Sequence, residues 1–415
     1  MKPVRLLVVG AGSRGTGYGR YALSHPEEAK VVAVAEPRQE YRRAMVEAHG
    51  IPAGNVFADW REAADRDRMA DAVIIATQDT MHVEPAEAFA ARGYAMLLEK
   101  PMAPDEAGCR RIVQAAVDND ILFAVCHVLR YTDYTQKLVS MIADGAVGEV
   151  VDIQRVEPVG YWHQAHAFVR GHWSNEARSS AMLLAKSCHD IDWLRYVMGV
   201  PCRRVSSFGS LFHFRPENRP DGAAERCLDC PVAPDCPYSA QHIYLDRLAA
   251  GNTGWPVSIL AREVTAESIT EALRTGPYGR CVSACDNDVV DHQVVNMEFE
   301  GGRTAGFAMV AFNAHGGRRT LVHGTRGEIR GDGRVLRHLD FLTDQWTEID
   351  TAATDASITG GHGGGDGRLM QSFLAAVATG DRSRILSGPA ETLESHLMVF
   401  AAERARRNGT VEEVA

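Results

Sequence analysis

The regular alternation of short apolar runs with helical stretches over the first 126 residues constrains the fold most. The runs are VRLLVV, KVVAVA, DAVIIAT, AMLL and ILFAVCHV, and a segment with a helical pattern separates each run from the next. Strands that alternate with helices at this spacing are typical of a parallel sheet with helices on both faces. We therefore predict an α/β fold whose N-terminal domain, residues 1–126, is a doubly wound parallel sheet.

Residues 127–415 have a different pattern. After a predicted helix over 181–198, stretches such as DHQVVNMEFEGGRTAGFAMVAFN alternate apolar and polar residues and turn at glycines, which is typical of antiparallel strands. We predict a second α/β domain on an open, mostly antiparallel sheet backed by helices, with a cysteine-containing insertion around residues 202–285.

The composition excludes several classes of partner. The chain has 415 residues, of which 45% are hydrophobic and 24% charged, and a net charge of -10 without a basic block. Nucleic acid and anionic membranes are therefore poor partners, and small molecules are better ones. No apolar run approaches the roughly 18 residues of a membrane span, and the run at Val4–Val9 is too short for a signal peptide. We predict a soluble, cytoplasmic protein.

A glycine fingerprint follows the first predicted strand. Gly10, Gly12 and Gly15 form G-x-G-x-x-G before a helix, and the next predicted strand ends at Glu36. Glycines let the backbone approach a pyrophosphate, which rests on the positive end of the helix, and Glu36 is placed to bind the ribose hydroxyls of an adenosine. A tight turn without a ligand is the other reading of this motif.

The expected cofactor is NAD, because Glu36 would repel the ribose phosphate of NADP. Arg38 lies two residues later, within reach of that phosphate, and this keeps NADP open as the alternative. The other predicted cofactor contacts are Ser13, Arg14, Thr77, His82, Glu99 and Lys100.

The segment GYAMLLEKPMAP delivers a charged pair at the end of a buried strand. Ligands of open parallel sheets bind outside the carboxyl ends of the strands, so Lys100 is expected at the rim of the crevice for the nicotinamide. There it can bind a substrate hydroxyl, and partial burial beside a nicotinamide cation would lower its pKa toward the range of a general base. A surface Glu/Lys pair that caps the strand is the alternative.

Together with a later His-x-x-Asp, the fingerprint and the EKP sequence resemble the Gfo/Idh/MocA family, which is named for glucose-fructose oxidoreductase, inositol dehydrogenase and a rhizopine-catabolism protein. The resemblance covers essentially the whole chain. It implies a Rossmann domain, a C-terminal α/β domain whose open sheet often serves in oligomer contacts, and a homo-oligomer such as a dimer or tetramer. It also implies that Lys100 is the substrate-binding and catalytic lysine, and that the substrate is a sugar, cyclitol or glycoside.

The stretch LLAKSCHDIDWL is the second predicted catalytic segment. Lys186 and His189 are three residues apart and would share a face of the helix. His189 is expected to take the hydroxyl proton, and Lys186 to keep that histidine neutral. The family usually has an Asp four residues before the His, where this chain has Ala185, so Lys186 is predicted to take part of that role. A buried core histidine is the alternative.

Three further segments supply predicted substrate contacts. The stretch GYWHQAHAFVRGHWSN has aromatic rings that can stack on sugars and polar groups that read hydroxyls, and GGHGGGD allows close backbone approach, although Asp366 is as well explained as a helix cap. The third segment follows the last strand of the first domain. The candidates are His127, Arg130, Tyr131, Trp162, His166, Arg170, Trp173 and His362.

The nine cysteines include a cluster in the insertion. Cys227 and Cys230 form C-x-x-C, Cys236 follows, and Cys281 or Cys285 is the natural fourth member. In a cytoplasmic chain this spacing favours metal over disulfides, and a structural zinc ion needs four such ligands. We predict a structural zinc site at Cys227, Cys230, Cys236 and Cys281, with an iron-sulfur cluster or free thiols as alternatives.

Three functions compete at this stage. The leading one is an NAD(P)-dependent dehydrogenase that acts on a secondary hydroxyl of a carbohydrate. The second is an NAD-dependent glycosidase, in which transient oxidation acidifies a neighbouring C–H bond, the glycosidic bond is eliminated, and the cofactor is regenerated. The third is a binding protein that senses NAD without catalysis, and the lysines and histidine of the predicted site argue against it.

Overall fold

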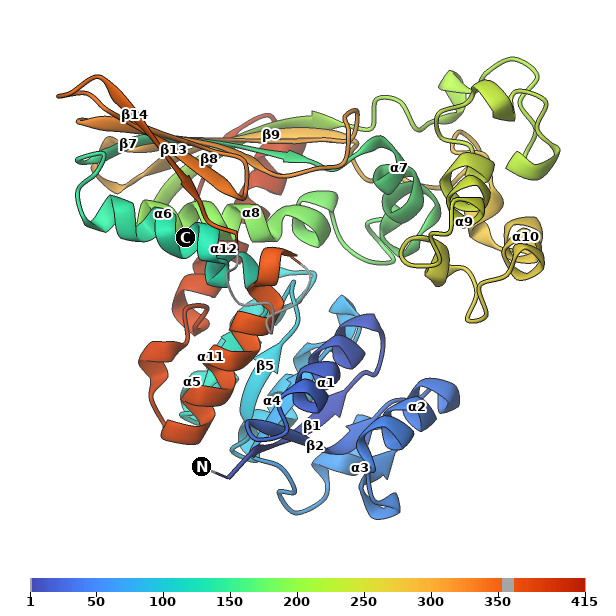
Figure 1. Cartoon of the computed structure of the whole chain (residues 1–415), viewed down its shortest axis with the longest axis horizontal. Helices are drawn as coiled ribbons and strands as arrows, with labels where there is room; N and C mark the ends of the chain where they lie inside the picture. The colour runs from blue at the N-terminus through green and yellow to red at the C-terminus, as the bar shows by residue number, and fades with distance from the viewer. Residues whose placement is uncertain (1, 353–361, 415) are drawn as a thin grey trace.

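The computed structural model describes residues 2–352 and 362–414 and contains the two predicted sheets (Figure 1). The first sheet has six parallel strands in the order β3-β2-β1-β4-β5-β6, which confirms the predicted doubly wound sheet. Its strands are β1 (Val4–Val9), β2 (Ala29–Ala35), β3 (Val56–Phe57), β4 (Ala72–Ile75), β5 (Ala95–Leu98) and β6 (Phe123–Val125).

Helices cover both faces of this sheet. One face packs against α3 (Trp60–Ala64), α4 (Val83–Ala91) and α5 (Glu106–Asp118), and the other against α1 (Ser13–Ser24) and α2 (Gln39–His49). The second face is completed by α11 (Gly365–Thr379), whose Leu369 and Phe373 share a core with Leu6 and Val8 of β1. The chain therefore returns to the first domain near its C-terminus.

The second sheet has nine strands in the order β14-β13-β12-β11-β7-β10-β9-β8-β15, and all neighbours are antiparallel except β7 and β10. This confirms the predicted open, mostly antiparallel sheet. Its strands are β7 (Val150–Pro158), β8 (Cys202–Ser210), β9 (His292–Phe299), β10 (Thr304–Val310), β11 (Arg319–Gly324), β12 (Gly327–Gly331), β13 (Val335–Asp340), β14 (Gln345–Asp350) and β15 (Val411–Glu413).

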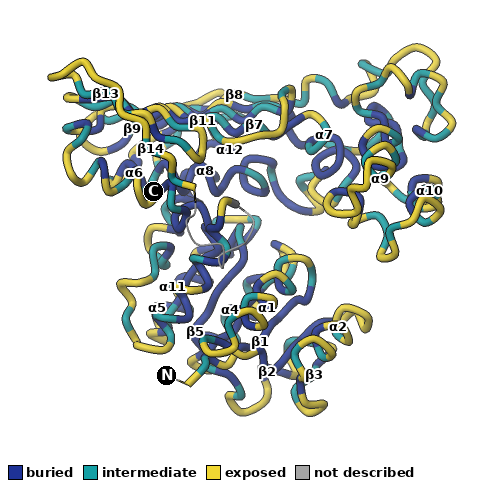
Figure 2. The backbone as a smooth tube through the Cα atoms, viewed as in Figure 1, coloured by how far each residue is buried: buried dark blue, intermediate teal, exposed yellow. Residues whose placement is uncertain are grey.

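One face of the large sheet is covered by helices, and the other is open. The covering helices are α6 (Asp133–Ala143), α8 (Met182–Met198) and α12 (Pro389–Asn408) (Figure 1). On the open face Phe208 and Val294 lie opposite each other on β8 and β9 and are 64% and 41% exposed. The contrast with the first sheet, whose strands are buried, is visible in Figure 2.

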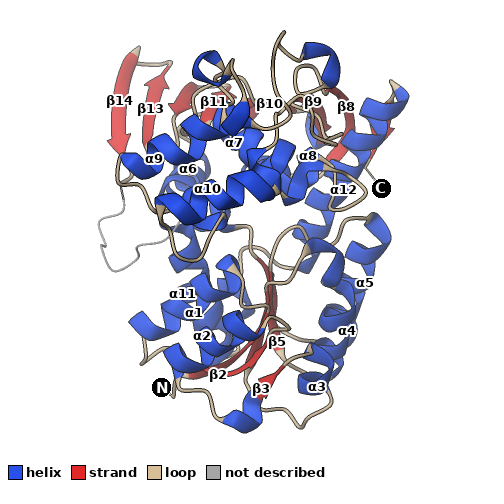
Figure 3. Cartoon of the chain, turned by 90° about the vertical axis from the view of Figure 1, so that its right-hand side faces the viewer, coloured by secondary structure: helices blue, strands red, loops and turns tan. Residues whose placement is uncertain are grey.

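The region between β8 and β9, residues 211–291, is called the insertion below. It contains α9 (Asp246–Ala249) and α10 (Ala266–Thr275) and has a small core of its own. Figures 1 and 3 show these helices gathered with α7 (Tyr161–His163) beyond one end of the large sheet. Within the described residues, no helix has the length and apolar character needed to cross a bilayer.

Candidate active site

The glycine loop after β1 has the geometry of a dinucleotide cradle. Gly10 has φ +89°, and a Cβ atom there would lie 2.6 Å from the Ala76 carbonyl oxygen. A Cβ on Gly15 would lie 1.9 Å from the Gly10 oxygen, so both positions require glycine. Gly12 precedes the first turn of α1, and a Cβ atom there would be in ordinary contact with the Arg38 guanidinium, at 3.6 Å. The N-terminus of α1 is therefore free to approach a pyrophosphate, and the loop fits NAD.

Glu36 lies where the sequence predicts it, at the carboxyl end of β2, but it is buried and hydrogen-bonded. Its carboxylate accepts the N–H of Ala11 at 2.7 Å and the Nε–H of Arg38 at 2.7 Å. Burial alone would raise the pKa of Glu36, but the hydrogen bonds from Arg38 and Ala11 hold it below its usual range. Arg38, half exposed, stacks on Tyr41 at 3.9 Å. At the end of the cradle where an adenosine would bind, the charge of Glu36 is therefore neutralised by its ion pair with Arg38.

Arg14 is held by two carboxylates. Its guanidinium lies 2.5 Å from Glu99 and 2.5 Å from Asp366 of α11, and it also donates to Tyr18. Burial would raise the pKa of Glu99, but Arg14 and the neighbouring lysine keep it below its usual value. Ser13 begins α1 beside this group. Asp366 is therefore an ion-pair partner that ties α11 to the glycine loop.

Lys100 lies at the carboxyl end of β5, beside the glycine loop. Its backbone N–H donates to the Glu99 carboxylate at 2.9 Å, and its Nζ donates to the Ala185 carbonyl oxygen at 3.0 Å. Ala185 is the position four residues before His189 where the family usually has an Asp. In this chain a backbone oxygen of α8, in place of an Asp side chain, orients the Lys100 ammonium group.

The segment after Lys100 is fixed by two buried histidines. His82 places Nδ1 2.9 Å from the Pro101 oxygen and Nε2 3.2 Å from the Thr77 oxygen, and Thr77 in turn donates to Met81. The Met102 N–H donates to Nε2 of His396 on α12 at 3.1 Å. His82, predicted as a cofactor contact, thus holds the segment after Lys100 in place through hydrogen bonds to its backbone.

Three histidine rings form a cluster around the lysine segment. The His127 ring lies 5.7 Å from that of His189 and 5.4 Å from that of His396. His127 is fully buried, and its ring nitrogens make no hydrogen bond within the described residues. Burial lowers the pKa of His127 to about 3 and that of His396 to about 4. Both rings are neutral at physiological pH.

These buried histidines predict acid sensitivity. An unfolded histidine titrates near pH 6.5, so below that pH the unfolded chain binds protons at these histidines and the folded chain does not. Stability is complete above that pH and is expected to fall, by about 1.4 kcal/mol per pH unit for each such histidine, as the pH drops toward the folded pKa values. Urea unfolding at pH 7, 6 and 5 measures this slope, and His127→Gln should flatten it. An unchanged slope in that variant would contradict a neutral buried His127.

Lys186 belongs to a buried charge network. Its Nζ lies 2.9 Å from Glu157 of β7, and Arg318 contacts both Glu157 (2.9 Å) and Asp190 (2.6 Å). Burial lowers the pKa of Lys186 and outweighs the attraction of Glu157. Lys186 and His189 therefore have different partners, since Lys186 reaches toward β7 and His189 toward the histidine cluster.

Arg130 and Tyr131, predicted to bind substrate, have internal partners. Arg130 is buried and donates to both oxygens of Asp192, at 2.7 and 2.8 Å, and Ser395 donates to the same carboxylate at 2.9 Å. The Tyr131 hydroxyl is 3.0 Å from that of Ser387. These contacts leave neither side chain free to reach a ligand.

The segment predicted as a non-periodic loop is helical. Residues 161–163 form α7, and Gln164–Arg170 continue as a wider helical turn in which every residue is buried. His166 contacts the Tyr244 hydroxyl at 2.9 Å, and Arg170 donates to the Tyr238 oxygen at 2.8 Å. Both therefore face the core of the insertion, because that region supplies partners that the local sequence does not reveal.

The remaining predicted wall residues have different surroundings. Trp162 lies 5.0 Å from the ring of Trp255, and Trp173 is 40% exposed beside Phe168. His362 begins a short turn before α11, and its side chain lies outside the described residues.

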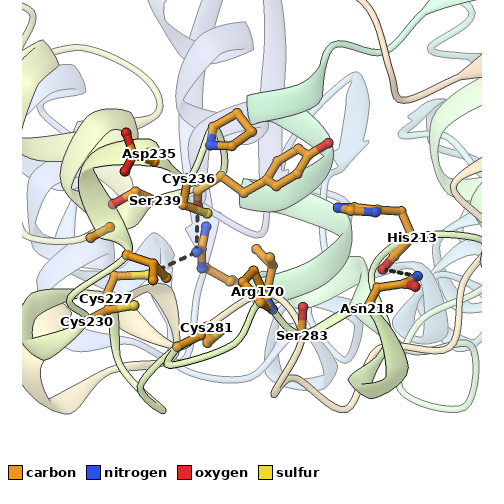
Figure 4. A pocket seen from close by; sticks show the side chains of 17 residues that line it. Arg170, His213, Asn218, Cys227, Cys230, Asp235, Cys236, Ser239, Cys281 and Ser283 are labelled. Carbon is orange, nitrogen blue, oxygen red and sulfur yellow. Dashed lines mark hydrogen bonds between the residues drawn. The ribbon is translucent and has the colours of Figure 1, made fainter.

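The four cysteines of the predicted zinc site line one cavity of about 340 Å³ (Figure 4). Over residues 2–352 and 362–414, however, no three His, Cys, Asp or Glu side chains are arranged to hold a metal ion, and all nine cysteines are free thiols. Arg170 donates to the sulfur of Cys227 at 3.4 Å and lies among the thiols. The structure thus gives no support to the zinc prediction.

Several residues of the site escaped the sequence analysis. Glu157, Arg318, His396 and Trp255 come from β7, the segment before β11, α12 and the insertion, far from any motif. Of these four, only Glu157 offered a signal in the sequence, because this charged residue stands at a position where the alternation of the strand places an inward-facing side chain. The other three are identified only once the chain is folded.

Comparisons with known proteins agree with this architecture. Inositol 2-dehydrogenase of Streptomyces avermitilis is 34% identical over 194 residues, 46% of this chain and 52% of that protein. 2,7-anhydro-N-acetylneuraminate hydratase of Mediterraneibacter gnavus is 26% identical over 214 residues, 51% of this chain and 54% of that protein. The alignments span about half the length of these two relatives. Levoglucosan dehydrogenase in complex with NADH and levoglucosan shares the fold, with a TM-score of 0.71 over 100% of both chains at 17% identity.

The family models cover most of the chain. Residues 4–127 match the oxidoreductase family with an NAD-binding Rossmann fold, and residues 139–414 match the C-terminal alpha/beta domain of the same oxidoreductase family. The two matches correspond to the two sheets described above. The chain therefore belongs to the Gfo/Idh/MocA family of oxidoreductases.

Proposed function

We propose that this chain is an NAD-dependent dehydrogenase that oxidises a secondary hydroxyl of a sugar, cyclitol or glycoside. The observation that carries the proposal is the position of Lys100, whose Nζ is held 3.0 Å from the Ala185 oxygen between the glycine loop and the helix that bears His189. Bound NAD would accept the hydride. The relatives named for inositol and levoglucosan point to the same class of substrate.

The roles of the chain's own residues follow from their surroundings. The ammonium of Lys100 would hydrogen-bond the reacting hydroxyl, and His189 would receive its proton. Lys186 is bound to Glu157, so in this proposal it contributes positive charge near the site while His189 moves the proton. The neutral ring of His127 lies beside His189, 5.7 Å away, and its Nε2 is 3.6 Å from the buried carboxylate of Asp192.

The NAD-dependent glycosidase is the second candidate. It uses the same lysine and histidine with no net change in the cofactor, and a relative is named as a hydratase of an anhydro sugar, which is a reaction without net redox change. NAD is favoured over NADP in both schemes, because residues 4–127 match the NAD-binding Rossmann domain of the family.

One assay separates the two candidates. Purified protein is incubated with NAD and a panel of free sugars, cyclitols and aryl glycosides, while nicotinamide reduction and aglycone release are both followed. NADH that accumulates in proportion to substrate supports the dehydrogenase. Aglycone release with a trace of NAD supports the glycosidase, and neither signal with any panel member would reject both.

The open face of the large sheet supports a further part of the proposal, a homo-oligomer such as a dimer or tetramer. Phe208 and Val294 are exposed on the neighbouring strands β8 and β9 of this face, and Leu321 is exposed on β11, which β7 and β10 separate from β9. Exposed apolar side chains grouped in this way are typical of protein interfaces. Light scattering coupled to size-exclusion chromatography tests it, and a monomer at micromolar concentration would contradict it.

A further inference from the structure

The insertion between β8 and β9 reaches back to the first domain. Its core is formed by residues such as Ile243, Val257 and Ile269, which are almost fully buried. Beyond this core Arg262 forms an ion pair of 3.0 Å with Glu40 on α2. The insertion is therefore connected to the large sheet at its ends and to the cofactor domain at its tip.

An aromatic group lies where the insertion meets α7. It consists of Trp162, His163, Trp255 and His315, and we call it the aromatic platform. The Trp255 ring lies 5.0 Å from that of Trp162 and 4.9 Å from that of His163, and the Trp162 ring lies 5.2 Å from that of His315. Arg247 of the insertion stacks on Trp162 at 4.1 Å. Trp255 is 43% exposed, so this large ring is only partly covered by its neighbours.

The platform is anchored at the ends of the parallel strands β7 and β10. The N–H of Gly160 donates to the Asn313 side chain at 2.9 Å, and a Cβ on Gly160, which has φ +92°, would lie 2.6 Å from that of His315. The loop after β10 is thus pressed against the start of α7. This close packing fixes the positions of Trp162 and His315.

The platform adjoins the catalytic helix. Lys186 of α8 binds Glu157 near the end of β7, and its charge adds to burial in lowering the pKa of His163 and of His315. The preceding residue, Ala185, holds Lys100. Of these two consecutive residues of α8, Ala185 therefore contacts Lys100 through its carbonyl oxygen, and Lys186 places a positive charge near the aromatic platform.

The platform is nevertheless separate from the histidine cluster around Lys100. Among the described residues, no ring contact joins Trp255 or Trp162 to His127, His189 or His396. A sugar ring with its hydroxyl at Lys100 would pack against the histidine cluster. The exposed face of Trp255 is then available to another part of the same ligand.

We propose that Trp255 is a stacking platform for a second ring of the substrate, through which the insertion selects glycosides and oligosaccharides over free monosaccharides. The C–H face of a pyranose packs on the face of an indole, and partly exposed tryptophans at the edge of a site are suited to such contacts. This inference rests on the proposed function, because it assumes a carbohydrate at Lys100.

The test compares binding of paired ligands to the NADH-loaded protein. Calorimetric titration uses a panel of hexose disaccharides and the corresponding free hexoses, with wild type, Trp255→Ala, Trp255→Phe and, as control, Trp346→Ala on β14. Loss of one aromatic stacking contact should weaken disaccharide binding about tenfold and leave hexose binding unchanged, and phenylalanine should restore most of the affinity. Trp346→Ala should match wild type, since Trp346 is equally exposed on a distant strand.

Each outcome decides a different point. A wild type that binds no panel member would reject the proposed function. A wild type that binds disaccharides no better than hexoses, or a Trp255→Ala variant that loses both alike, would overturn the role of Trp255 and leave the proposed function in place. NADH affinity and melting temperature, measured for every variant, identify any loss caused by misfolding.

Discussion

Replacing Lys100 by methionine is expected to lower turnover of the oxidised substrate by about 10²–10⁴-fold while NADH still binds. Methionine has nearly the length of lysine but offers no donor to the hydroxyl. The lysine makes one hydrogen bond of its side chain, to the Ala185 oxygen, so its loss leaves a single backbone acceptor without that partner. The glycine loop and Glu36, which are proposed to bind the dinucleotide, are untouched by the change.

The measurement is kcat with the substrate that the panel identifies, together with fluorescence titration of NADH. Lys137→Met on α6 is the matched control, since Lys137 is exposed on a helix of the second domain and should retain wild-type turnover. A Lys100→Met variant with turnover within tenfold of wild type would remove Lys100 from the chemistry. It would then favour the third hypothesis, a protein that binds NAD without catalysis.

Replacing Asp192 by alanine is expected to destabilise the folded protein by about 3–5 kcal/mol. Asp192 accepts two hydrogen bonds from Arg130 and one from Ser395, and all three side chains are buried. Without the carboxylate the Arg130 guanidinium stays buried with no negative partner, and its desolvation is no longer compensated. The effect is larger than the loss of hydrogen bonds alone, because a full charge is involved.

Urea unfolding followed by circular dichroism at pH 7 measures this change. Glu84→Ala removes an exposed ion pair with Arg61 of similar length, 2.6 Å, and should cost at most about 1 kcal/mol. An equal loss in the free energy of unfolding for the two variants would show that burial does not determine how much the Asp192–Arg130 ion pair contributes to stability. Turnover of the surviving folded fraction should change little, because Arg130 makes no contact with the Lys100 side chain.

The cofactor half of the site was predictable because its signals are local. The turn after β1 needs glycine at Gly10 and Gly15 for steric reasons that act within a few residues, and the position of Glu36 follows from the end of the next strand. The strand before Lys100 is equally local, since an apolar run and a proline mark its end. These features required no knowledge of the second domain.

The substrate half was predictable only in part. The helix of His189 has the predicted boundaries, but the side chains grouped with Lys186 come from β7 and from the segment before β11. Arg170 and His166, which read as exposed wall residues, face the insertion because its aromatic residues cover them. The zinc prediction also lacks support, because the spacing of the cysteines does not reveal that Arg170 lies among the thiols in the folded chain.

The sequence by itself determined the two sheets, the dinucleotide cradle and the position of Lys100, because periodicity, glycine sterics and strand ends act over short stretches of chain. Only the tertiary structure decided which charges pair, which histidines are buried and neutral, and which aromatic rings gather beside the catalytic helix. Arg14 with Asp366, and Trp255 with Trp162, are partners separated by long stretches of sequence. Such contacts depend on how helices and insertions pack on the two sheets, and no local pattern encodes that packing.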